Sequence, residues 1–208
     1  MNPQPLIGIS GRKRTGKDTL AGFLVAGHGF TRLAFADPLK AIVAELNPAI
    51  PAYTALGSDD PDDAWRVQDE LDSCKSDTDP AGWEGAKAEP EVRRLLQAQG
   101  EAVRRHLGEN VWVDATINKA HYLLAEGKPV VIPDVRYPNE AERIKALGGI
   151  VVRVNRPGTA EGTSSTDLHI SETALDGYDF DVIVTNDSDV AFLKRAAKRI
   201  SDARNWRR

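Results

Sequence analysis

Short apolar runs alternate along the chain with longer stretches in which apolar residues recur at helical spacing. The run from Leu6 to Ile9 predicts a buried strand, and the apolar positions between 19 and 24 recur at i, i+1, i+4 and i+5, which predicts one face of a helix. The same criteria predict further strands at 30–35, from 130, at 150–154 and at 181–185, and helices at 38–46, 91–107, 111–125, 140–147 and 190–203.

This alternation predicts an α/β fold with a mainly parallel five-stranded sheet and right-handed crossovers. Ligands of such folds bind at the carboxyl ends of the strands. Two features interrupt the pattern. Residues 47–90 are rich in Pro, Asp, Ser and Gly, which predicts a loop-rich region that is either a mobile flap over a substrate or a poorly ordered insert. Gly100 is expected to break or kink the helix predicted at 91–107.

Composition narrows the class of protein. The 208 residues carry a formal net charge of −4, which argues against a nucleic-acid polymer as the main partner. Cys74 is the single cysteine, so no intrachain disulfide can form and a reducing compartment fits. No apolar stretch approaches the ~20 residues of a membrane span, and the N-terminus lacks the features of a signal peptide. We therefore expect a cytoplasmic protein without a membrane partner.

The loop after the first strand carries the clearest chemistry. It reads GRKRTGKDT from Gly11 to Thr19, close to the phosphate-binding pattern G-x-x-x-x-G-K-[ST]. The two glycines allow backbone N–H groups to point at a polyphosphate, and Lys17 would reach its outer phosphates. Asp18 replaces the usual Ser or Thr, but its carboxylate is also a hard ligand for Mg²⁺, and Thr19 adds a hydroxyl. The pattern predicts nucleotide binding rather than a simple basic turn.

Two further strand ends carry charged residues. Asp134 and Arg136 follow the strand that starts at 130, where the carboxylate could hold Mg²⁺ and the guanidinium could grip a second phosphate. The alternative is an internal Asp–Arg ion pair that fixes the turn. Asp37 is the expected N-cap of the helix through 46, with Lys40 one turn later, and both serve either capping and surface charge or a substrate.

Several motifs in this order resemble the deoxynucleoside monophosphate kinases of tailed bacteriophages. They are GRKRTGKDT, FADPLK, LLQAQG, GENVWVD, VVIPDVRYPNEAE, VVRVNRPG and HISETALDGYDFDVIVTND. In that family an Asp follows the loop lysine, as Asp18 does here. The resemblance implies a P-loop NTPase three-layer sandwich that transfers the γ-phosphoryl of ATP to a deoxynucleoside 5′-monophosphate with Mg²⁺. It also allows a homodimer.

The resemblance further implies roles for individual residues. It assigns ATP binding to Gly11, Arg12, Lys13, Arg14, Thr15, Gly16, Lys17, Asp18, Thr19 and Arg156. Binding of the monophosphate falls to Asp37, Lys40, Arg94, Gln97, Arg105, Trp112, Asp134, Arg136 and Glu172. The catalytic residues would be Arg14, Lys17, Asp18 and Arg136, and the metal ligands Asp18, Thr19 and Asp134.

The expected organisation is one P-loop kinase domain with its core at 1–46 and 129–208. The inserted helical region at 47–128 would bind the monophosphate, and residues 156–173 would form a lid. Two other functions remain open at this stage. One is a P-loop kinase for another small acceptor, such as dephospho-coenzyme A. The other is a P-loop ATPase that is not a kinase. Such an ATPase carries a Walker-B carboxylate after a hydrophobic strand, and VVIPD partly satisfies that pattern.

Overall fold

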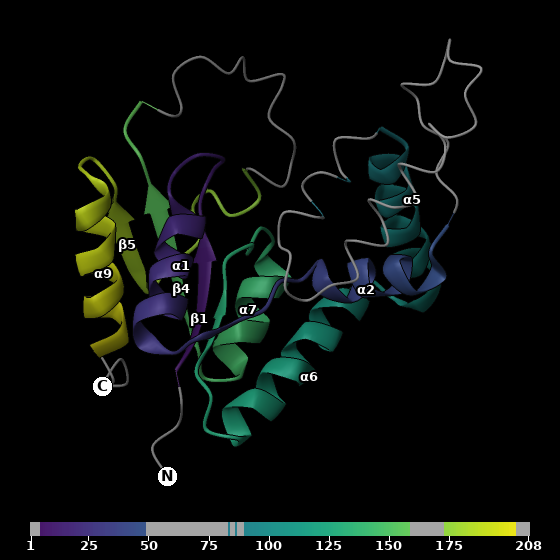
Figure 1. Cartoon of the computed structure of the whole chain (residues 1–208), viewed down its shortest axis with the longest axis horizontal. Coiled ribbons are helices and arrows are strands. Elements are labelled where there is room, and N and C mark those ends of the chain that lie inside the picture. Colours follow the sequence, from purple (N-terminus) through teal and green to yellow (C-terminus); the bar gives the residue numbers. More distant parts are fainter. Residues whose placement is uncertain (1–4, 49–82, 84–85, 87–89, 159–172, 203–208) are drawn as a thin grey trace. The chain divides into compact units, whose positions relative to one another are not determined.

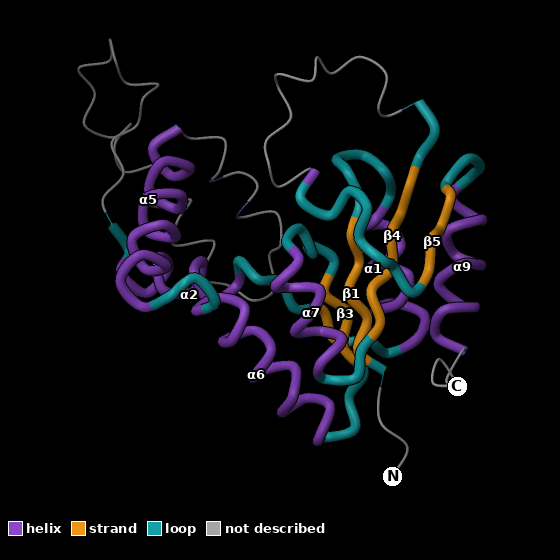
Figure 2. The backbone as a smooth tube through the Cα atoms, turned by 180° about the vertical axis from the view of Figure 1, so that it is seen from behind, coloured by secondary structure: helices purple, strands orange, loops and turns teal. Residues whose placement is uncertain are grey.

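A computed structural model of the chain describes residues 5–48, 83, 86, 90–158 and 173–202. Its sheet has the strand order β2-β3-β1-β4-β5, and every neighbouring pair is parallel (Figures 1 and 2). The strands are β1 (Leu6–Ser10), β2 (Thr31–Arg32), β3 (Val130–Ile132), β4 (Ile150–Asn155) and β5 (Val182–Thr185). The helices are α1 (Lys17–His28), α2 (Asp37–Leu46), α5 (Pro90–Leu107), α6 (Val111–Ala125), α7 (Pro138–Ala146) and α9 (Val190–Asp202).

Alternation along the central strand β1 builds a core on each face of the sheet. Ile7 and Ile9 pack in one cluster with side chains of α1 and α9, whereas Leu6 packs in the other with α7 and with the part of α6 from Val113 onward. Figure 1 shows α1 and α9 side by side. Successive side chains of a strand point to opposite faces, so β1, whose five residues are all buried, has cover on both faces. The three-layer α/β architecture expected from the sequence is confirmed.

The described chain forms two compact units. The first comprises Met1–Phe35 and Val113–Arg208, and the second comprises Ala36–Trp112. The expected insert at 47–128 differs from the second unit by one helix at each end. The reason is packing, because α2 contacts α5, whereas Val113 and Ala120 of α6 belong to the core of the sheet.

The second strand is shorter than the predicted 30–35. The ladder to β3 continues only through the N–H of Leu33, which donates to Val131 O at 3.0 Å. The N–H of Phe35 then donates to the carboxylate of Asp134, at 3.1 Å from Oδ2. A side chain thus replaces the next backbone acceptor, and the strand ends.

Two expectations about helix ends and breaks are wrong. Asp37 is not the N-cap of α2, because Ala36 occupies that position and no side chain caps the helix. Asp37 instead lies in the first turn, where its charge still suits the helix dipole. Gly100 does not break α5, which runs unbroken through it. Gly100 is buried, and a Cβ there would lie 3.2 Å from Leu39 Cδ2, so the glycine permits close packing inside the second unit.

Candidate functional site

The loop between β1 and α1 needs both of its glycines. A Cβ at Gly11 would lie 2.6 Å from Val154 O and 2.7 Å from Thr15 Oγ1. Gly16 has φ of 98°, and its Cβ would lie 2.8 Å from Asn186 Nδ2. Contacts under 3.0 Å and a left-handed backbone exclude larger residues, so the sequence motif corresponds to a tightly packed turn.

Internal hydrogen bonds hold this loop in shape. The Thr15 hydroxyl donates to Arg12 O at 2.9 Å, and Asn186 Nδ2 donates to Thr15 O at 2.9 Å. The Thr15 side chain is buried, so any contact of Thr15 with a nucleotide would come from its backbone. Arg14 has φ of 65°, a left-handed backbone that a non-glycine residue rarely adopts. This loop is a preformed turn, and backbone strain at a binding loop is typical of functional sites.

Positive charge gathers around the turn. Lys17 begins α1, and its Nζ lies 3.5 Å from Asp18 Oδ2. Lys13 and Arg14 are exposed residues of the loop. The first turn of α1 adds its unpaired N–H groups and the positive end of its dipole. This arrangement of positive groups fits a polyanion such as a nucleoside triphosphate.

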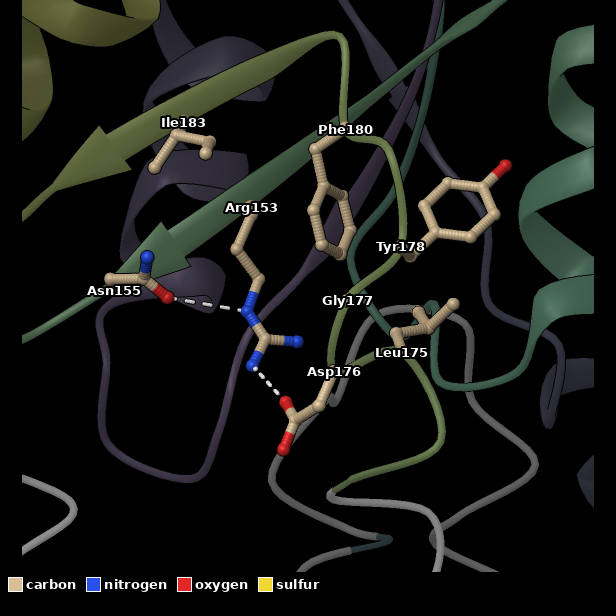
Figure 3. Close-up of a pocket in the computed structure, with 8 residues that line it drawn as sticks. All are labelled: Arg153, Asn155, Leu175, Asp176, Gly177, Tyr178, Phe180 and Ile183. Atoms are coloured by element: carbon tan, nitrogen blue, oxygen red, sulfur yellow. Dashed lines mark hydrogen bonds and ion pairs between the residues drawn. The ribbon is translucent and has the colours of Figure 1, made fainter.

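The remaining loop cation, Arg12, makes an ion pair. Its Nη2 lies 3.0 Å from Asp176 Oδ2, and Arg153 Nη2 lies 3.1 Å from Asp176 Oδ1. Arg153 also stacks over Phe180, with Cζ 5.4 Å from the ring centroid, and donates to Asn155 Oδ1 at 3.2 Å. Figure 3 shows Arg153, Asn155, Asp176 and Phe180 among the residues that line a pocket beside β4 and β5. The volume of this pocket is about 270 Å³.

Arg153 and Asp176 were not among the predicted site residues. The available signal was a charged residue inside the apolar run IVVRV, which normally requires a partner when buried. The partner, Asp176, lies 23 residues away, and sequence spacing does not reveal it.

The turn after β3 lies next to the end of β1. The N–H of Val135 donates to Ile9 O at 3.2 Å. Asp134 and Arg136 therefore flank a residue that is hydrogen-bonded to β1, the strand that leads into the glycine loop. The Arg136 side chain is exposed. The first unit therefore brings the glycine loop and the Asp134–Arg136 turn together at the carboxyl ends of the strands, as the sequence predicted for parallel strands.

A buried carboxylate fixes the backbone of this turn. Glu140 Oε2 accepts the N–H of Arg136 at 2.6 Å and the N–H of Tyr137 at 3.0 Å. Glu140 is only 6% exposed, and this burial raises the pKa of its carboxyl to about 7, although the two backbone donors oppose the shift. The sequence analysis placed Glu140 only at a helix start and missed this role.

The predicted metal ligands offer few protein oxygens. The Asp18 side chain is 76% exposed, and Thr19 is exposed in the same first turn of α1. Both oxygens of Asp134 accept the Phe35 N–H. Within the described residues, no three His, Cys, Asp or Glu side chains form a metal-binding group. These residues fit Mg²⁺ that takes most of its ligands from water and nucleotide phosphates, as this ion usually does.

Several predicted acceptor residues lie on the helices of the second unit. Lys40 Nζ on α2 lies 5.8 Å from the centroid of the Trp83 ring. On α5, Arg94 pairs with Glu91 at 2.5 Å, and this hydrogen bond lowers the pKa of the Glu91 carboxyl. Gln97 and Arg105 are exposed on the same helix.

Trp112 packs inside the second unit. Its ring is buried and its Nε1 donates to Gly100 O at 3.2 Å. A contact of Trp112 with substrate stays a prediction. Arg156 is exposed just beyond β4, and Glu172 lies outside the described residues.

A five-stranded parallel sheet with a glycine-and-lysine turn between β1 and α1 defines an α/β kinase fold of the P-loop class. The family model described as deoxynucleotide monophosphate kinase matches residues 83–197. The chain belongs to the deoxynucleotide monophosphate kinase family and is a nucleotide kinase.

Two viral relatives support this assignment. A protein of Acanthamoeba polyphaga mimivirus, which its name assigns provisionally to the same kinases, is 33% identical over 196 residues, covering 89% of this chain and 90% of the relative. The deoxynucleotide monophosphate kinase of Enterobacteria phage T4 is 24% identical, covering 89% and 93%. Among solved structures, dephospho-CoA kinase from Campylobacter jejuni covers 97% of both chains at 11% identity with a TM-score of 0.49.

Proposed function

We propose that this chain transfers the γ-phosphoryl group of ATP to a deoxynucleoside 5′-monophosphate, giving ADP and the deoxynucleoside diphosphate. A phosphate oxygen of the acceptor attacks the γ-phosphorus as the bond to the β-phosphate bridging oxygen breaks. The observation that carries the proposal is the hydrogen bond from Val135 N–H to Ile9 O. It sets the turn of Asp134 and Arg136 beside the strand that enters the glycine loop.

In this proposal, the glycine loop holds the donor. Phosphoryl transfer requires that the two anionic reactants are held in line. It also requires that the negative charge on the transferred group is neutralised. Lys17 and Arg14 would neutralise that charge, while backbone N–H groups between Gly11 and Thr19 would hold the phosphates. Asp18, Thr19 and Asp134 would hold Mg²⁺ directly or through water, and the ion would offset the negative charge of the phosphates.

The acceptor would lie against the turn after β3. Arg136 would bind its phosphate in a bidentate fork, with Arg105 as a second cation. Asp37, Lys40, Arg94, Gln97 and Trp112 would also bind the monophosphate, the last three of them from the inserted region at 47–128. Residues 156–173 would form the lid, with Arg156 on the donor and Glu172 on the lid or the acceptor.

The wider role follows from the reaction. A kinase of this kind would supply nucleotides for DNA synthesis, in the host cytoplasm if a phage encodes it, and would act on small nucleotides rather than on a nucleic-acid polymer. A homodimer is part of the proposal. Among the described residues, no helix is long and apolar enough to cross a bilayer.

A coupled assay of ADP release tests the proposal. The assay uses ATP with dTMP, dGMP, dCMP and dAMP in turn, their ribose counterparts, and dephospho-coenzyme A. We expect ADP release that depends on a deoxynucleoside monophosphate and yields the diphosphate. Release that depends only on dephospho-coenzyme A, or that needs no acceptor at all, would contradict the proposal and favour another P-loop kinase or an ATPase.

A further inference from the structure

Asn186 lies directly after β5 and is one of the few buried polar residues described, with 5% of its surface exposed. Its side chain donates from Nδ2 to Thr15 O at 2.9 Å, and its backbone N–H donates to Asn155 O at 2.7 Å. The first bond crosses 171 residues of sequence and ends on the glycine loop. Asn186 therefore connects the last strand to the middle of that loop.

The direction of this bond determines the direction of a second group. A trans peptide is planar, and its C=O and N–H point to opposite sides. Because Asn186 holds the C=O of Thr15 on the buried side, the N–H of Gly16 in the same peptide points away from Asn186. In the proposed donor role, the loop would present its N–H groups to the phosphates on that side.

The left-handed backbone at Gly16 makes this peptide sensitive to its partner. Gly16 has φ of 98° and no Cβ, so little else in the residue resists rotation of the adjoining peptide. A Cβ at Gly16 would also lie 2.9 Å from Leu193 Cδ1, so the loop is packed against α9 as well as against Asn186. Packing limits the position of the loop, whereas the hydrogen bond from Asn186 selects the orientation of the peptide.

We propose that Asn186 is a positioning residue of the donor site, which orients the peptide between Thr15 and Gly16 so that the Gly16 N–H donates to a phosphate of the bound nucleotide. The inference rests on the proposed donor role of the loop. It adds a residue far from the sequence motif, and it separates two effects of Asn186. A role in packing alone changes stability, whereas a role in orientation changes the affinity for the nucleotide at a given stability.

The test replaces Asn186 with leucine, which is similar in size, neutral and without a donor. Asp189→Ala is the control, because Asp189 Oδ1 accepts the Phe192 N–H at the start of α9 and its loss also destabilises the fold. For each variant we would measure the urea unfolding midpoint, the Kd for MgATP, and KM for ATP and for dTMP. We expect Asn186→Leu to weaken ATP binding about tenfold or more, with KM for dTMP nearly unchanged, since a hydrogen bond to a charged group is lost.

An amide NMR spectrum supplies a direct readout. Addition of MgADP to the original chain should shift the Gly16 amide proton strongly downfield, and this shift should be lost in Asn186→Leu but kept in Asp189→Ala. Equal ATP affinity in Asn186→Leu and Asp189→Ala at matched loss of stability would overturn the inference. If the leucine variant does not fold, Asn186→Ala is measured in the same way.

The original chain separates this inference from the proposed function. If it binds no ATP and transfers no phosphoryl group, the proposed function fails. If it uses ATP and Asn186→Leu binds ATP equally well, only the positioning role fails.

Discussion

Asp176 Oδ2 lies 3.0 Å from Arg12 Nη2, although 164 residues separate the two in sequence. The other oxygen of the same carboxylate pairs with Arg153 of β4. One carboxylate thus links the glycine loop to the sheet beside it. The Asp176 side chain is 42% exposed, so water screens both pairs and their contribution to stability is small.

Asp176→Ala should therefore lower the free energy of unfolding by no more than about 1 kcal/mol. A double-mutant cycle with Arg12→Ala, measured by urea unfolding, should give a coupling energy of about 0.2–1 kcal/mol. The matched control is the cycle of Arg12→Ala with Asp187→Ala, since Asp187 is an exposed carboxylate outside this network. Additive effects in the Asp176 cycle would show that the ion pair makes no measurable contribution to stability.

Lys17→Ala should abolish phosphoryl transfer and leave the fold intact. Lys17 starts α1 and forms an ion pair with the exposed Asp18, so alanine removes the cation without opening the core. We expect kcat/KM to fall by about 1000-fold or more, the scale of a cation that stabilises a transferring phosphoryl group. The unfolding midpoint should stay close to that of the original chain.

Lys198→Ala is the control for charge, because Lys198 pairs with Asp202 on the exposed face of α9. It should keep full activity. Full activity in Lys17→Ala instead would remove the donor site from the glycine loop.

Arg136→Ala should act on the acceptor rather than on the donor. Because the side chain is exposed, its removal should not change stability. Loss of a charge-assisted contact with a phosphate should raise KM for dTMP or lower kcat by about tenfold to 100-fold. Titration with MgATP should give a Kd near that of the original chain. A loss of ATP affinity with an unchanged acceptor KM would reverse the two sites.

The order of elements could be predicted from the sequence because it depends on local pattern. Apolar runs such as Leu6–Ile9 require burial on both faces, and a helix after each run then requires parallel strands. The glycine loop was also predictable, since its chemistry lies within nine consecutive residues. The proximity of the glycine loop to Asp134 and Arg136 was predictable too, because both segments follow the carboxyl ends of parallel strands.

The errors came from packing between distant residues. Gly100 has the low helix propensity that predicts a break, yet contact with Leu39 and the hydrogen bond from Trp112 hold it inside α5. The roles of Asn186 and Asp176 depend on partners far away in sequence, and no spacing rule finds such pairs. The available signal was Arg153, a single charged residue inside the apolar run IVVRV, which indicates that a partner exists without naming it.

Glu140→Gln should change how stability depends on pH. Burial raises the pKa of the Glu140 carboxyl from 4.5 to about 7, so the folded chain favours the neutral form. For a carboxyl with a raised pKa, the favourable contribution to stability is complete below about pH 4.5 and is lost as the pH rises through about 7. A shift of this size corresponds to at most about 3 kcal/mol, lost progressively over that interval.

Glutamine is neutral at every pH, and its amide oxygen can still accept the N–H of Arg136 and of Tyr137. The stability of Glu140→Gln relative to the original chain should therefore increase between about pH 5 and about pH 8, as measured by urea unfolding at each pH. Glu142→Gln on the same helix is the control, because its exposed carboxylate is solvated by water. The same difference between Glu140→Gln and the original chain at both pH values would mean that Glu140 is already ionised at the lower pH, and that the two backbone donors outweigh its burial.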